Sequence, residues 1–154
     1  MKKEEYSAIR ELAWDILLKS NTSCLPVKIT PIAKIYGYEN TIDYNMSRID
    51  NTYILSRLIL KNHKITANAL TIKTLSVRIL CPMCVLYECN ITNSEKIAKI
   101  CDIPENIALE RANRLQMLIK RNKFYSSDIE YLVYMKFEKF IENYKKVNGS
   151  FSSH

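Results

Sequence analysis

The chain has 154 residues, a hydrophobic fraction of 47%, a charged fraction of 25% and a net charge of +7. These values allow one globular domain and exclude a wholly disordered chain. Only 2 Gly and 4 Pro are present, too few for the tight turns of a β-sandwich or barrel. No apolar run approaches the roughly 18 residues of a membrane span or forms a signal core, so we expect a cytoplasmic protein with reduced thiols and no membrane partner.

The first third of the chain predicts two helices and a polar segment. Apolar residues at three- and four-residue steps predict an amphipathic helix over 4–19. Pro26 disfavours helix at the residue before it, so an extended segment follows. Pro31 is expected at the first position of a short helix that Gly37 ends. The polar residues 38–50 predict a loop or at most a small β-hairpin.

Residues 52–62 and 66–89 are both expected to be helical. The short apolar runs 53–55 and 58–60 are also compatible with strands, because periodicity cannot decide so short a run. Pro82 must kink the second helix or begin a new one.

A capping-box pattern marks the next helix, with Thr92 as the expected N-cap and Glu95 reaching back to it. That helix is predicted to run to about Cys101. Pro104 then opens another helix that continues to about Arg121.

A second capping box, Ser127 to Glu130, precedes an apolar stripe that predicts a C-terminal helix. The predicted organisation is a main domain over 1–123, a C-terminal packing helix over 124–147 and a frayed tail over 148–154. The fold class is mostly α, a compact multi-helix domain.

The whole basic surplus lies in residues 51–123, which carry twelve Lys and Arg against five Asp and Glu. Such a surplus favours an anionic partner, although a solvated lysine-rich surface is the alternative. Residues 94–101 and 104–120 also resemble a helix-turn-helix in length, so nucleic-acid binding is possible. The predicted binding residues are Arg57, Lys61, Lys64, Arg78, Arg114 and Lys120.

Four cysteines, Cys81, Cys84, Cys89 and Cys101, have the spacing C-x2-C-x4-C-x11-C. Such thiols can bind zinc or can serve as small core residues. The second CxxC of a zinc ribbon is missing, and His63 has no acidic neighbour to orient it, so we expect no metal site and no cofactor.

Seven segments follow one another in a fixed order: YSAIRELAW (6–14), LPVKI (25–29), IAKIYG (32–37), SVRILCP (76–82), EKIA (95–98), IP (103–104) and ALERANRL (108–115). Together they resemble the opening helix, the "lPv" segment and the closing helices of the ImmA/IrrE family, small zinc metallopeptidases of phages and mobile elements. The resemblance implies a reduced form of the family's α+β fold.

The family's zinc site is the part that this chain lacks, because no HExxH occurs in it. The best register replaces the two histidines by Ser56 and Leu60, the catalytic glutamate by Arg57 and the third ligand by Thr71. Leu has no donor atom and Arg cannot act as a base, so none of these positions can perform the original chemistry. Arg57, followed by Lys61 and Lys64, then lines a basic cleft or points to solvent from a closed one.

The resemblance therefore implies a catalytically inactive, metallopeptidase-like binding protein, a pseudoprotease. Its expected partner is a protein, either a repressor of a phage or mobile element or a host defence component. Two alternatives stay open: an active zinc metallopeptidase with an unrecognised site that includes His63, and a nucleic-acid-binding domain that uses the basic residues of 51–123.

Overall fold

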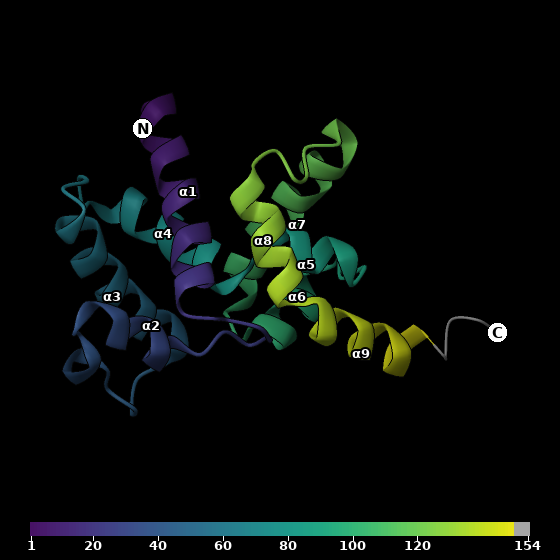
Figure 1. The fold of residues 1–154 in the computed structure, drawn as a ribbon, viewed down its shortest axis with the longest axis horizontal. Coiled ribbons are helices and arrows are strands. Elements are labelled where there is room, and N and C mark those ends of the chain that lie inside the picture. The colour runs from purple at the N-terminus through teal and green to yellow at the C-terminus, as the bar shows by residue number, and fades with distance from the viewer. Residues whose placement is uncertain (150–154) are drawn as a thin grey trace.

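The computed structural model describes residues 1–149, which form nine α-helices and one 3₁₀ turn (Figure 1). This confirms the mostly α prediction, and no strand occurs within these residues. In the segment 38–50, residues 39–41 form the 3₁₀ turn η1, further turns follow instead of a hairpin, and residues 48–50 already belong to the next helix, which was predicted to begin at 52. The elements are α1 (Lys3–Lys19), α2 (Ile29–Tyr36), η1 (Glu39–Thr41), α3 (Arg48–Asn62), α4 (Ala69–Leu80), α5 (Met83–Glu88), α6 (Ser94–Cys101), α7 (Glu105–Arg121), α8 (Asp128–Lys136) and α9 (Glu138–Gly149).

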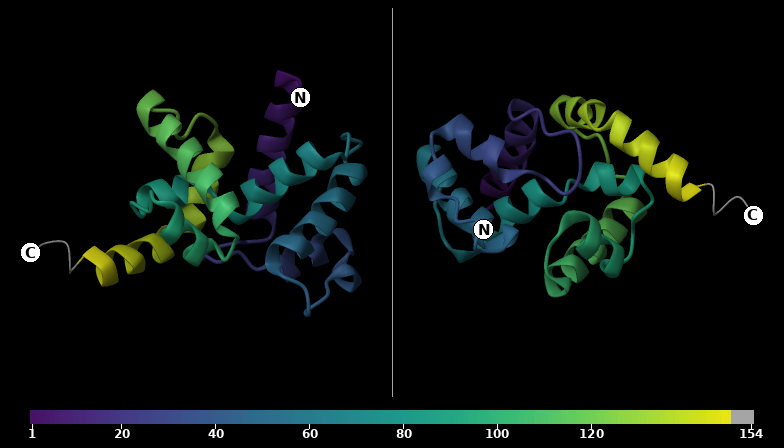
Figure 2. Two further views of the ribbon diagram at one scale, coloured as in Figure 1. Left: turned by 180° about the vertical axis from the view of Figure 1, so that it is seen from behind. Right: turned by 90° about the horizontal axis from the view of Figure 1, so that it is seen from below.

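Helices α1 and α4 form the centre of the molecule. They pack on each other, α3 covers α4 on one side, and α8 packs on α1 on the other. Figures 1 and 2 show α2 and α3 on one side of this pair and α5 to α8 on the other. The buried side chains of both sides meet the central pair in one continuous core, which includes Ile9, Leu17, Leu55, Leu75, Leu80 and Phe137.

The proline positions predicted the helix boundaries well. Pro82 separates α4 from α5, so it begins a new helix and does not kink an existing one. Gly37 ends α2 in the left-handed conformation, with φ 73°, as predicted. Pro31, however, is the third residue of α2 and not the first, a position that it tolerates because the first N–H groups of a helix have no partner within it.

The predicted N-cap of α6 is wrong by one residue. Asn93, not Thr92, caps this helix, and its Oδ1 accepts a hydrogen bond from the Lys96 backbone N–H at 2.8 Å. Asn is at least as good an N-cap as Thr, and the capping-box pattern alone cannot choose between adjacent candidates. The second predicted cap is present, since Ser127 Oγ accepts from the Glu130 N–H.

The C-terminal stripe belongs to two helices, α8 and α9. Phe137 is the C-cap residue of α8, with φ −93° and ψ 0°, and lies between the two helices. Its side chain is fully buried. A continuous apolar stripe cannot reveal this break, because Phe137 and Ile141 face the core on both sides of it. Helix α9 extends away from the other helices (Figure 2). Of the frayed tail expected over 148–154, Asn148 and Gly149 belong to α9, and residues 150–154 lie outside the described part.

Within residues 1–149, no helix has both the length and the apolar composition needed to cross a bilayer.

The N-cap assignment of α6 can be tested with two alanine variants. We expect Asn93→Ala to lower the free energy of unfolding by about 1 kcal/mol, because the Lys96 N–H loses its acceptor. Thr92→Ala, its matched control, should change it by less than about half as much. Urea unfolding followed by circular dichroism measures both values, and a larger loss for Thr92→Ala would restore the original cap.

Candidate functional site

The positions aligned with the zinc site lie in the interface between α3 and α4. Ser56 and Leu60 of α3 and Thr71 of α4 are buried. The Ser76 hydroxyl donates to the Ser56 hydroxyl at 2.8 Å across this interface. The Thr71 hydroxyl donates to the Thr66 carbonyl at 2.6 Å. The bond between Ser76 and Ser56 therefore joins α4 to α3, whereas the bond of Thr71 runs to the segment directly before α4.

The three basic residues near the end of α3 do not gather around these positions. Arg57, Lys61 and Lys64 are all exposed, and Lys64 follows the helix end with φ 58°. Lys120, at the end of α7, is exposed as well. The structure therefore brings only two of the six predicted binding residues together, Arg78 and Arg114, as described next.

Arg78 and Arg114 line a cleft between α1, α4, α7 and the segment that leads into α8, here called the arginine cleft. Its cavity of about 60 Å³ has room for about two water molecules or one small polyatomic anion. Four arginines and one lysine line it together with a single acid: Arg10, Arg78, Arg111, Arg114, Lys123 and Glu130.

Arg111 is the most unusual side chain of the cleft, since it is only 7% exposed. One Nη donates to the Cys81 carbonyl at 3.0 Å, while Nε has no hydrogen-bond partner within residues 1–149. None of the ion pairs in this part of the chain includes Arg111. Burial lowers the pKa of Arg111 because the charged form is removed from water. A buried charge without a counter-ion is costly, so the site favours an anion.

Arg78 faces the same cleft from α4. Its guanidinium lies 4.7 Å from the centroid of the Tyr6 ring and also donates to the Tyr6 hydroxyl. Burial lowers the pKa of Arg78 to about 10. Burial raises the pKa of Tyr6, but the charges of Arg78 and Arg114 outweigh it and the net shift is downward. The positive charges of the cleft therefore lower the cost of ionising the Tyr6 hydroxyl.

Glu130 is the one acid among the residues that line the cleft. Its Oε1 accepts a hydrogen bond from the Ser126 N–H at 3.2 Å, and no ion pair joins it to an arginine in the described chain. Burial raises the pKa of Glu130, so the fold disfavours its charged form. The cleft thus keeps a large excess of positive charge.

The cysteines of the predicted zinc pattern are all buried in the core. Within residues 1–149, no group of three or more His, Cys, Asp and Glu side chains is placed to hold a metal ion. A hydrogen bond with Cys101 lowers the pKa of Cys81, and burial raises the pKa of Cys84. His63 lies apart from the thiols, with Nε2 at 3.0 Å from the Tyr36 hydroxyl.

Helices α6 and α7 pack on each other as a helix-turn-helix would, with Asp102 in the left-handed conformation at the turn. Two arginines of α7, however, Arg111 and Arg114, line the arginine cleft. Arg111 is buried there and Arg114 is half-buried, which weakens the case for α7 as a DNA-reading helix.

Sequence reasoning missed Arg10, Arg111 and Lys123 as members of the site. Arg111 and Arg114 are three residues apart, a spacing that places both on one face of α7. That spacing was a usable signal. Nothing in the sequence pattern indicates that Arg10, in the balanced N-terminal segment, meets them from α1.

The structure and the site define an all-helical domain with an arginine-lined cleft. Comparisons with protein-family models, curated proteins and solved structures found no match for this chain. The relation to the ImmA/IrrE family therefore stays a prediction from the motifs.

Because α3 packs on α4, we expect a substitution at buried Ser56 to destabilise the protein and one at exposed Arg57 to have little effect. Ser56→His should lower the free energy of unfolding by roughly 1–3 kcal/mol, because the larger side chain must enter a filled interface. Arg57→Ala should change it by less than about 0.5 kcal/mol, because Arg57 is exposed. Urea unfolding of both variants tests this, and equal losses would contradict a closed interface.

Proposed function

We propose that the protein is a non-catalytic binding protein whose arginine cleft holds an anionic group of its partner. One observation carries the proposal: Arg111 is buried, is free of ion pairs within residues 1–149, and faces a cavity that three further arginines and a lysine line. Inside the protein the pKa of the Cys81 thiol is lowered first by a hydrogen bond with Cys101 and then by the Arg111 charge, whereas an anion in the cavity supplies a full counter-charge.

The chemistry of guanidinium groups favours an oxyanion over a halide. A guanidinium donates from a planar fork whose geometry matches a carboxylate or a phosphate. Several forks around a small cavity suit a tetrahedral dianion best, because such an ion has acceptor oxygens in several directions. A phosphate group is therefore the expected ligand, and its enclosed site suits a terminal group better than a continuous phosphodiester backbone.

A binding role also agrees with the positions aligned with the family's zinc site. Leu60 has no donor atom, Arg57 cannot act as a base, and Ser56 is engaged with Ser76. If the motif resemblance is correct, the protein is an inactive relative of the ImmA/IrrE peptidases. Its partner is then a repressor of a phage or mobile element, or a host defence protein, that presents an anionic group to the cleft.

Nucleic-acid binding is the competing function. This function predicts a different salt dependence. Phosphate contacts along a strand release counter-ions, so the affinity falls steeply with salt. The exposed residues Lys120 and Arg121 at the end of α7 are the natural contacts for such a strand. The outcome of the following experiment separates the two functions.

Inorganic phosphate is the first probe of the cleft. We expect the melting temperature to be about 4 °C higher in about 20 mM phosphate than in chloride of equal ionic strength, because an anion that binds only the folded state stabilises it. Arg114→Gln should weaken phosphate roughly tenfold by calorimetry, since a charge-assisted hydrogen bond is lost. Arg121→Gln, on the same helix but outside the cleft, is the matched control and should leave the affinity unchanged.

Three outcomes oppose the proposal. Equal melting temperatures in phosphate and chloride would falsify it. Equal losses in the Arg114 and Arg121 variants would show a general charge effect instead of a site. Tight binding of a single-stranded oligonucleotide that phosphate does not compete, and that falls steeply with salt, would favour the nucleic-acid function. A parallel titration with acetate distinguishes a carboxylate ligand from a phosphate.

Glu130 predicts the pH dependence of the site. Burial raises its pKa above that of the unfolded chain, so its charged form costs stability at neutral pH and that cost disappears below the raised pKa. Glu130→Gln keeps an acceptor for the Ser126 N–H and removes the repulsive charge. We expect it to bind sulfate roughly three- to tenfold more tightly at neutral pH.

Sulfate is the suitable probe here because its own charge does not change over this range. The affinity of the unchanged protein should rise as the pH falls through the pKa of Glu130, until it meets that of the variant. Glu138→Gln, at an exposed position of α9, serves as the control. Parallel affinity curves for the unchanged protein and Glu130→Gln at all pH values would mean that Glu130 does not act on the ligand.

A further inference from the structure

A second hollow lies at the start of α2 and shares no lining residue with the arginine cleft. It has a volume of about 710 Å³, within the range of sites that hold drug-sized ligands or short peptide segments. One wall is residues 28–34, at the beginning of α2, and the other is residues 42–48 together with Asp102. This hollow is here called the α2 groove.

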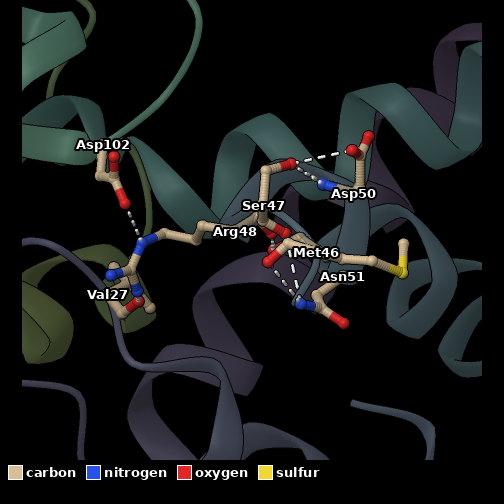
Figure 3. Close-up of polar contacts among 8 residues, drawn as sticks. Val27, Met46, Ser47, Arg48, Asp50, Asn51 and Asp102 are labelled. Atoms are coloured by element: carbon tan, nitrogen blue, oxygen red, sulfur yellow. Dashed lines mark hydrogen bonds and ion pairs between the residues drawn. The ribbon is translucent and has the colours of Figure 1, made fainter. Parts of the chain in front are cut away.

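Polar contacts hold both walls of the α2 groove in place (Figure 3). The guanidinium of Arg48 lies between Asp102, whose Oδ2 is 3.1 Å from Nε, and the Val27 carbonyl, to which it also donates. Arg48 thereby ties α3 both to the segment before α2 and to the turn between α6 and α7. A pre-formed groove loses less entropy on binding than one that must be assembled.

The buried side-chain amide of Asn51 holds the loop that forms the second wall of the α2 groove. Its Oδ1 accepts from the Asp43 N–H at 2.9 Å, and its Nδ2 donates to the Asp43 carbonyl at 2.8 Å. The same Nδ2 lies within 3.3–3.4 Å of the carbonyls of Ser47 and Met46 (Figure 3). These hydrogen bonds therefore tie the loop to α3.

This fixed loop presents apolar side chains to solvent. Tyr44 is 82% exposed and Met46 is 36% exposed, and both line the α2 groove with Ile29, Pro31 and Ile42. A large aromatic side chain that is exposed on an ordered loop is typical of a contact residue in an interface.

The charges at the α2 groove specify the occupant further. Lys28 and Lys34 are exposed at its edge, and neither belongs to an ion pair within residues 1–149. Arg48 is already neutralised in part by Asp102. The first N–H groups of α2 add positive potential on the same side, because no side chain caps this helix. An occupant with negative charge on either side of an apolar residue matches this pattern.

We propose that the α2 groove docks an acidic peptide segment of a partner protein, in which carboxylates flank an aromatic or aliphatic side chain. The apolar residue packs on Tyr44 and Met46, and the carboxylates lie near Lys28 and Lys34. A nucleic acid fits less well, because Asp102 repels a phosphate backbone and the lining offers one aromatic ring for stacking. The proposal does not depend on the function of the arginine cleft.

Selection from random peptides displayed on phage tests the proposal on the full-length protein. We expect the enriched peptides to combine Asp or Glu with an aromatic or aliphatic residue. Synthetic copies should lose roughly tenfold in affinity for Lys34→Glu and for Tyr44→Ser, measured by fluorescence anisotropy. Both positions are exposed, so these variants should fold normally. Lys61→Glu, an exposed lysine outside the groove, is the matched control and should bind like the unchanged protein.

Four other results would overturn the proposal. Enrichment of peptides without acidic residues excludes the charge match, and unchanged binding to the Lys34 and Tyr44 variants places the peptide elsewhere. Loss of binding in Arg114→Gln alone assigns the peptide to the arginine cleft. An oligonucleotide that binds through Lys34, with no acidic peptide enriched, makes the groove a nucleic-acid site. Phosphate binding by the Lys34→Glu variant reports separately on the arginine cleft.

Discussion

The burial of one positive charge, that of Arg111, is the constraint on which the arginine cleft depends. Its guanidinium donates to the Cys81 carbonyl, which lies at the end of α4, one residue before Pro82 begins α5. The carbonyl groups at the end of a helix have no hydrogen-bond donor within that helix, and this carbonyl is one of them. Arg111 thus serves two purposes: it satisfies the end of α4 from α7, and it places a charge in a cavity that no acid neutralises within residues 1–149.

The neighbours of Arg111 explain why the protein tolerates this charge. Tyr6 offers its ring and its hydroxyl to Arg78, so part of the positive charge of the cleft is balanced by a group that is neutral in water. Glu130 faces the same cavity, yet burial opposes its ionisation. Tyr6 and Glu130 therefore reduce the positive potential of the cleft without cancelling it. A bound anion would complete the balance, and this is the reason for assigning the proposed function to the cleft instead of the exposed lysines.

The sequence predicted the helices better than the site. Local signals located several helix ends, and Gly37, Pro82 and Ser127 lie where their conformational preferences require. The break at Phe137 was missed because tertiary packing and not local preference decides it. Two of the five basic residues of the arginine cleft, Arg78 and Arg114, were predicted from charge density, whereas Arg10 joins them only because α1 packs on α4.

Helix α4 shows why the site lies where it does. Ser76 and Arg78 are two residues apart, which separates them by about 200° around the helix axis. Ser76 faces α3, where its hydroxyl meets Ser56 and lets the two helices approach closely. Arg78 faces α1 and the cleft. The serine contact closes one side of α4 against α3, so the proposed ligand site lies on the charged side of the same helix. The proposed loss of a metal site and the proposed gain of an anion site thus follow from opposite faces of one helix.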